Sequence, residues 1–206
     1  MIKSLFKAKI SDLIDSKNAL TTENAKAIFN FFDNSKLFRW QDANNDCEDR
    51  ANAICILLDE WNIPNAKSWV FSGYMFKKKG YLENMWKYHV ATILPVKENG
   101  QINFYAIDPA TTKQLTLVQD WAENVTDNPY SYYVLKNGTY YIFDPHTIKK
   151  RNWSKRNKGN FNWTMQGLAG INGLSAKGKA TLAFNKKKVI KATDSFMKLK
   201  NEKISF

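Results

Sequence analysis

The pattern of hydrophobic and polar positions predicts helices in the first third of the chain. Residues 3–32 favour one or two helices, since Thr21 or Thr22 followed by Glu23 is a typical helix cap before NAKAIFNFF. A second helix is expected from Asp46, where apolar residues recur at spacings of three and four. This apolar face consists of Ala51, Ile54, Leu57, Leu58 and Trp61, and Pro64 ends the pattern.

Further along, runs rich in β-branched and aromatic residues predict strands. KSWVFSGYMF, from residue 67, is the first, and WKYHVATILPVKENGQINFYAIDP (86–109) contains two more around Asn-Gly, a strong hairpin signal. SYYVLKNGTYYIFDP (131–145) repeats this pattern, while 112–127 is expected to be a surface connection with a short helix. Segregated helices and strands of this kind predict an α+β domain with a largely antiparallel sheet.

The hairpin fixes which side chains share a face. A turn at Asn99-Gly100 places Ala91 opposite Asp108 with His89 on the diagonal, and a turn one residue earlier places His89 directly opposite. Either turn therefore puts His89 and Asp108 on one face, whereas a loop with an odd number of residues would separate them. The same face carries Ala91, Ile93, Phe104 and Ala106, and its two alanines leave room for a helix end to approach.

The two cysteines differ in their surroundings. Cys47 and Cys55 lie eight positions apart on one expected helix, so their Cα atoms would be about 12 Å apart. That distance is too long for a disulfide. Cys55 falls on the apolar face and is interpreted as a core thiol. Cys47 lies at the polar start of the helix, where packing alone does not explain a thiol.

A thiol at a helix start, with a histidine and an aspartate side by side on a sheet, provides the groups for nucleophilic acyl transfer. The helix start favours the thiolate and offers a backbone N–H to an oxyanion. Three acids beside the thiol oppose its ionisation, so we expect activation to depend chiefly on the His89 imidazolium. These acids are Asp46, Glu48 and Asp49.

Three strings in this order carry a resemblance to a known family: DCxxRAxxxxxxL from Asp46, WxYHVAxIL from Trp86, and IDPA from Ile107. Over about residues 40–145 the chain resembles the bacterial protein-glutaminases, cysteine enzymes of the transglutaminase and papain-like superfamily that deamidate glutamine side chains in proteins. The chain departs from the family pattern at Asp46, where glycine is usual, and in lacking the family's disulfide cysteines.

The resemblance implies a catalytic cysteine, histidine and aspartate at Cys47, His89 and Asp108. It implies a transglutaminase/papain-like core and a protein substrate with an accessible glutamine, with no metal or organic cofactor. Trp86 is interpreted chiefly as a packing residue and secondarily as a substrate-binding residue at the cleft edge. The expected organisation is a helical segment at 1–39, a catalytic core at 40–148 and a basic segment at 149–206 that packs on or extends the core.

Net charge divides the chain unevenly. Residues 1–148 contain 16 Lys and Arg against 17 Asp and Glu, whereas residues 149–206 contain 15 against 2, which gives −1 and +13. Aromatic residues among these charges would suit nucleic-acid binding, but a charged face that keeps the protein soluble is the favoured interpretation. Attraction to an acidic protein, as substrate or inhibitor, fits the same charge.

Other functions and sites remain open at this point. The same triad would serve a thiol protease or a transglutaminase, and a non-enzymatic basic binding module would act through residues 149–206 instead. His146 with Asp144 is a weaker second set. GLSAKGKAT, from Gly173, lacks the Ser or Thr that a phosphate loop needs at Ala180, and two histidines without an HExxH motif argue against zinc.

No apolar run reaches the roughly 18 residues of a membrane span, and the first fifteen residues do not read as a signal peptide. We therefore expect a protein that stays in the cytoplasm or leaves by a route independent of signal peptides. A deamidase with a basic tail would suit a bacterial toxin or effector that is held in check by an acidic inhibitor or immunity protein.

Overall fold

The structure is a computed structural model that describes residues 3–4, 18–35, 38, 40, 47–60, 62–71, 88–126 and 132–137. The helices in this part are α1 (Thr22–Asp33), α2 (Cys47–Glu60) and α3 (Val118–Val125). The strands are β1 (Lys3–Ser4), β2 (Leu20–Thr21), β3 (Ala66–Phe71), β4 (Tyr88–Glu98), β5 (Gln101–Ile107), β6 (Thr116–Leu117) and β7 (Tyr132–Asn137). None of these helices has the length and apolar character needed to cross a bilayer.

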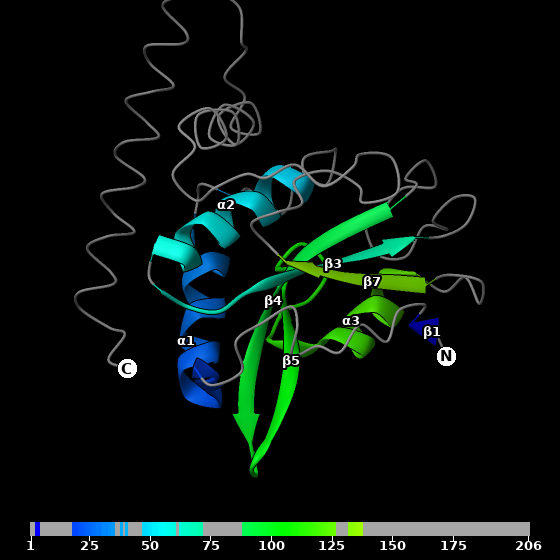
Figure 1. Cartoon of the computed structure of the whole chain (residues 1–206). Coiled ribbons are helices and arrows are strands. Elements are labelled where there is room, and N and C mark those ends of the chain that lie inside the picture. Colours follow the sequence, from blue (N-terminus) through cyan, green and yellow to red (C-terminus); the bar gives the residue numbers. More distant parts are fainter. Residues whose placement is uncertain are drawn as a thin grey trace, which may run out of the picture.

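All of the described strands belong to one sheet, with the order β1-β7-β3-β4-β5-β6 and with β2 beside β4 (Figure 1). The long strand β4 lies near the middle and runs antiparallel to β3 and to β5. Two-residue segments form the parallel pairs, β1 with β7 and β2 with β4. The predicted α+β class with a largely antiparallel sheet is therefore confirmed.

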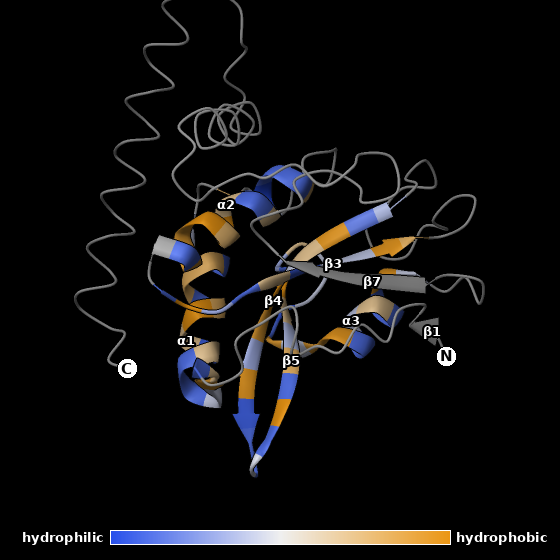
Figure 2. Ribbon diagram, viewed as in Figure 1, coloured by the Kyte–Doolittle hydropathy of each residue, from blue (hydrophilic) through white to orange (hydrophobic). Residues whose placement is uncertain are grey.

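The hairpin between β4 and β5 turns at Asn99-Gly100, because Glu98 pairs with Gln101 and every pair further along keeps that register. Asn99 and Gly100 have φ angles of 50° and 80°, both in the left-handed region that a type I′ turn requires. The first of the two registers considered above is thus the observed one. Figure 2 shows that the hairpin tip is hydrophilic, as expected for a turn in solvent.

Helices cover both faces of the sheet: in Figure 1, α2 lies above strands β3 and β7 and α3 lies below them. On the α2 side, α1 and α2 enclose the larger core with the even-numbered apolar residues of β4. On the other side, α3 packs against the odd-numbered residues of β4. The core of the first side includes Ile28, Phe29, Phe32, Ile54, Leu57, Leu58, Leu94 and Val96.

The first helix begins where its cap was expected. Thr21 is the N-cap, and its side-chain oxygen accepts a hydrogen bond from the backbone N–H of Asn24 at 3.2 Å. The expectation of helix from residue 3 onward is wrong at residues 3–4 and 20–21, which are short strands. Both segments pair with a neighbouring strand, so main-chain hydrogen bonding to the sheet replaces helical hydrogen bonding there.

The segment 112–127 contains the short helix predicted for it, but it is more than a surface connection. Trp121, Ala122 and Val125 of α3 are fully buried against the sheet. Thr116–Leu117, just before the helix, also adds a strand next to β5. The sequence did not reveal this buried face, because only three of the eight residues of α3 are buried and polar residues separate them.

Candidate active site

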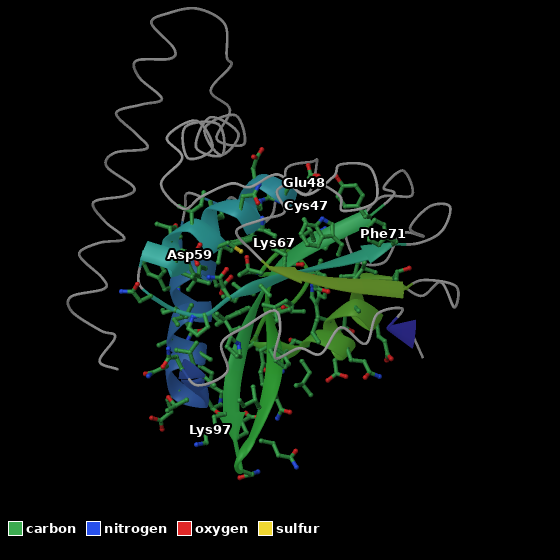
Figure 3. The ribbon with its side chains drawn as sticks, in the orientation of Figure 1. Cys47, Glu48, Asp59, Lys67, Phe71 and Lys97 are labelled. Atoms are coloured by element: carbon green, nitrogen blue, oxygen red, sulfur yellow. The ribbon has the colours of Figure 1, made fainter. Side chains whose placement is uncertain are left out.

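Cys47 is the first residue of α2, at the end of the helix that lies over the sheet (Figure 3). Its side chain is 8 % exposed and packs with Ala51, Trp69, Phe71 and Val90. The backbone N–H groups in the first turn of a helix have no partner within the helix, so partial positive charge gathers there. The predicted helix start at the thiol is confirmed to within one residue, and Asp46 lies outside the described residues.

Cys55 is the structural cysteine of the pair. It is 1 % exposed, and its thiol lies 3.8 Å from the carbonyl oxygen of Ala66 and 3.6 Å from the hydroxyl of Thr92. Burial raises the pKa of the Cys55 thiol to about 11, although the charge of Lys67 lowers it in part. Both cysteines are free thiols, as their spacing on one helix predicted. Cys55 therefore remains a neutral core thiol at physiological pH.

His89 and Asp108 meet on one face of the hairpin, as the turn predicted. The ladder between β4 and β5 ends at the pair Thr92–Ile107, so Asp108 follows directly after the last paired residue. Nε2 of His89 lies 2.8 Å from Oδ2 of Asp108, and both side chains are buried. The sheet therefore provides a fixed imidazole–carboxylate pair at the end of its central hairpin.

Two further side chains hold the carboxylate in place. Trp121 of α3 donates its indole N–H to Oδ2 of Asp108 at 2.9 Å, and the hydroxyl of Thr111 donates to the same oxygen. The backbone N–H groups of Thr111 and Thr112 donate to the carbonyl of Asp108 at 3.0 Å, which forms a tight turn after the strand. Charge-assisted hydrogen bonds of this kind fix both the orientation and the ionised state of a carboxylate.

These supporting donors were not predicted from the sequence. The string DPATT contained a usable signal for Thr111, since a hydroxyl three residues after an aspartate commonly closes such a turn. Trp121 gave no comparable signal, because it reaches Asp108 only through the packing of α3 on the sheet.

The charges within this pair reinforce one another. Burial disfavours the imidazolium, but the carboxylate of Asp108 and the side chain of Cys47 outweigh burial and raise the pKa of His89 to about 10. Burial also opposes ionisation of Asp108, yet the charge and hydrogen bonds of its neighbours lower its pKa. At neutral pH the pair is therefore an imidazolium and a carboxylate, and the Cys47 side chain interacts with the imidazolium.

All three predicted residues line one cavity. The cavity lies at the end of β5, next to Ile107 and Asp108. It is also lined by residues 89–91 of β4, which come before the first β4 residue that pairs with β5. Because Nε2 of His89 is bonded to Asp108, Nδ1 is the ring nitrogen that can exchange a proton with Cys47. The other lining residues are Trp40, Arg50, Ala51, Ile54, Val90, Ala91 and Ile107.

Arg50 anchors one wall of this cavity, one helical turn after Cys47. Its Nε donates to the carbonyl oxygen of Phe38 at 2.9 Å, and its guanidinium lies 5.7 Å from the ring centre of Trp40. The indole N–H of Trp40 in turn donates to the carbonyl of Phe32, near the end of α1. In the sequence, Arg50 was noted only as part of the DCxxRA motif. In the structure its side chain connects α2 to Phe38 and Trp40 in the segment before the helix.

The helix that uses the space beside the alanines is not the cysteine helix. Ala91 and Ala106 pack against α3, while α2 lies on the opposite face, where Val90 touches Cys47. The hydroxyl of Thr92 also donates to the carbonyl oxygen of Ala51, at 3.0 Å, and so fixes α2 to that face. Cys47 and His89 meet at the cavity beside the start of β4, and Ala91 also lines this cavity.

Several other predicted features lie outside the described residues: Trp86, His146 with Asp144, GLSAKGKAT and the basic segment 149–206. Within the described part of the chain, no group of three or more His, Cys, Asp or Glu side chains is arranged to hold a metal ion.

Comparison with known proteins gives matches of two kinds. A family model described as glutaminase matches residues 25–125, a range that contains Cys47, His89 and Asp108. A comparison of the sequence with curated proteins found no match.

Solved structures of protein-glutaminases have a similar fold. The NMR structure of protein-glutaminase from Chryseobacterium proteolyticum aligns with a TM-score of 0.59 and 15 % identity, over 78 % of this chain and 90 % of that one. A crystal structure of protein-glutaminase gives 0.61 and 16 %, over 79 % and 93 %. A crystal structure of pro-protein-glutaminase gives 0.60 and 17 %, over 79 % and 62 %. At these identities the structures show a shared fold.

Proposed function

The chain belongs to the protein-glutaminase family, and from this premise we propose that it hydrolyses glutamine side-chain amides in proteins, with Cys47 as the nucleophile. The observation that supports the proposal is the shared cavity, in which the thiol interacts with an imidazole that is 2.8 Å from a buried carboxylate. A thiol, an imidazole and an orienting carboxylate are the three groups that covalent acyl transfer requires.

The first half of the reaction forms an acyl-enzyme. The Cys47 thiolate attacks the carbon of the substrate carboxamide, and the backbone N–H at the start of α2 donates to the oxyanion. His89 then gives its Nδ1 proton to the leaving nitrogen, and ammonia departs as the thioester forms. The raised pKa of His89, about 10, keeps that proton on the ring at neutral pH until the leaving group needs it.

The second half of the reaction restores the enzyme. After ammonia has left, His89 is neutral and takes a proton from a water molecule, which attacks the thioester carbon. The C–S bond breaks, glutamate replaces glutamine in the substrate, and the thiolate pairs again with the imidazolium. Asp108 holds the ring in one orientation throughout, because its oxygen also accepts from Trp121 and Thr111.

Ammonia release from a glutamine-rich protein such as casein tests the proposal. The wild-type chain should release ammonia in proportion to time and enzyme, and Cys47→Ala should release none above the buffer control. Cys55→Ala is the matched control, since it removes the other thiol of the same helix, which lies outside the cavity. Equal release by wild type and Cys47→Ala would contradict the proposal.

The same incubation separates deamidation from the two related reactions of a cysteine triad. Cleavage of the substrate chain would indicate a thiol protease, and covalent substrate dimers would indicate a transglutaminase. Cleavage would overturn the assignment of the side-chain amide as the bond that is hydrolysed. Covalent dimers would overturn the assignment of water as the acceptor, even though deamidation and cross-linking both release ammonia, because an amine then takes the acyl group.

A further inference from the structure

A hydrogen bond beside the candidate site joins the two elements that carry the thiol and the imidazole. The hydroxyl of Tyr88 donates to Oε1 of Glu48. Glu48 follows Cys47 in the first turn of α2, and Tyr88 precedes His89 at the start of β4. The contact therefore lies one residue away from both groups of the proposed thiol–imidazole pair, although neither side chain takes part in the proposed chemistry.

The aromatic ring of Tyr88 is held by the sheet. Tyr88 pairs with Phe71 across β3 and β4, and the two ring centres are 5.8 Å apart at a tilted angle. The ring is half-buried and also packs with the cluster that contains Cys47. A tyrosine fixed in this way presents its hydroxyl at a defined point above the end of the sheet.

The first turn of α2 contains two acidic side chains, Glu48 and Asp49, between the buried residues Cys47 and Arg50. A second hydrogen bond from β4 to the helix, from the hydroxyl of Thr92 to the carbonyl of Ala51, lies one turn deeper. Helix ends without tertiary contacts fray. A displacement of about 1 Å between reacting groups is enough to cost about a hundredfold in rate.

We propose that Tyr88 and Glu48 are positioning residues, whose hydrogen bond holds the start of α2 against β4 so that the Cys47 thiol meets His89. This inference rests on the proposed function for its catalytic meaning. It also assigns a role to an acid beside the nucleophile: the carboxylate of Glu48 serves as a hydrogen-bond acceptor for the sheet.

Two variants separate the hydrogen bond from the charge. Tyr88→Phe removes the hydroxyl and keeps the ring, so the first turn of α2 loses this hydrogen bond to β4. Glu48→Gln keeps an oxygen acceptor and removes the charge. Asp49→Asn, the adjacent acid, is the matched control for a change of charge in the same turn.

The first measurement is the rate constant for alkylation of Cys47 by iodoacetamide at pH 7, assigned by peptide mass. Tyr88→Phe should lower it about tenfold, as expected when the thiol loses its alignment with the imidazolium, whereas Glu48→Gln and Asp49→Asn should stay within about twofold of wild type. Ammonia release should follow the same order through kcat, with KM unchanged.

A double variant guards against a general loss of structure. Both side chains belong to one hydrogen bond, so removing both should cost no more than removing one. The rate constant for Cys47 alkylation in the double variant Tyr88→Phe/Glu48→Ala should therefore be no lower than that of the slower of the two single variants, Tyr88→Phe and Glu48→Ala. A wild-type alkylation rate in Tyr88→Phe, or an equal loss in Glu48→Gln, would overturn the positioning role. Since alkylation needs no substrate, a chain that shows this pattern but releases no ammonia would contradict the proposed function and leave the positioning role intact.

Discussion

Asp108 accepts hydrogen bonds from an imidazole, an indole and a hydroxyl, which gives one buried carboxylate three donors. This concentration is the physical reason that it can stay ionised inside the protein, where an unpaired carboxylate would take up a proton. The carboxylate in turn keeps His89 protonated despite burial. At the residue scale, the protonation state of the imidazole therefore depends on the hydrogen-bonded carboxylate of Asp108.

Asp108→Asn tests this dependence, because it keeps the shape and removes the charge. We expect kcat for ammonia release to fall roughly ten-thousandfold, by analogy with a serine-protease triad that carries the same Asp→Asn change. The pKa of His89 should fall from about 10, since the charge that opposes burial is gone. A ring titration by NMR and steady-state kinetics measure both effects, and a kcat within about threefold of wild type would contradict the role.

Trp121 offers a finer test, since Trp121→Phe removes the N–H that lies 2.9 Å from Oδ2 of Asp108 and keeps an aromatic ring. The loss of one hydrogen bond to a charged group should lower kcat about tenfold, with KM unchanged. The ring of Trp121 lies 5.9 Å from that of His89, so retaining an aromatic side chain limits the packing change. A lower melting temperature with unchanged kcat would show a purely structural role.

At the element scale, the hairpin brings His89 and Asp108 together. Its turn residues both have positive φ, and a Cβ added at Gly100 would meet no atom within 4 Å. The cost of Gly100→Ala should therefore come from the backbone alone, at about 1 kcal/mol of unfolding free energy.

Thermal or denaturant unfolding measures this cost, and kcat should remain close to that of wild type, because register is set by the whole ladder of pairs. Gln101→Ala, the next residue along, has no positive φ and is the control. An equal effect of the two substitutions would show that the turn conformation is not what stabilises the hairpin.

The sequence was sufficient for those parts of the fold that depend on local periodicity. The parity of the Asn99-Gly100 turn predicted the shared face of His89 and Asp108, and the apolar stripe after Cys47 predicted α2. The resemblance in the DCxxRA, WxYHVA and IDPA strings predicted the family that the chain belongs to.

What local patterns could not predict is how the elements pack on one another. Nothing in the periodicity of β4 says which face receives α2 and which receives α3, so the helix that packs beside Ala91 could not be named from the sequence. The indole of Trp121 and the hydroxyl of Tyr88 reach their partners across 13 and 40 residues, separations at which sequence spacing carries no geometric information.

At the scale of the whole molecule, buried ionisable groups make the free energy of unfolding depend on pH. His89 has its pKa raised from 6.5 to about 10, so the stability it contributes is fully present below pH 6.5 and is lost as pH rises toward 10. Lys67 acts in the opposite sense, because burial lowers its pKa from 10.5 to about 8 and stability rises with pH above 8.

The contribution of His89 is measured by comparing wild type with His89→Gln. Between pH 6.5 and 8, before Lys67 titrates, the difference in unfolding free energy should shrink by up to about 1.4 kcal/mol per pH unit. Denaturant unfolding at several pH values gives this slope. A difference that is constant or grows with pH would mean that His89 is not held as an imidazolium.

The charge division between residues 1–148 and 149–206 remains a prediction about partners, since the basic segment lies outside the described residues. Two further statements are also predictions from the sequence: that this segment attracts an acidic substrate or inhibitor, and that the protein acts as a toxin or effector. The proposed reaction depends on none of these, because the cavity, the thiol and the imidazole–carboxylate pair all lie between residues 40 and 108.

The most direct test of the central claim is the mass of a glutamine-containing protein after incubation in ¹⁸O-labelled water. Hydrolysis through a Cys47 acyl-enzyme replaces an amide nitrogen by one solvent oxygen, so each modified site should gain about 3 Da instead of about 1 Da. The gain should appear with wild type and with Cys55→Ala, and should be absent with Cys47→Ala. The same gain with Cys47→Ala, or a substrate that is cleaved or cross-linked instead, would contradict the account.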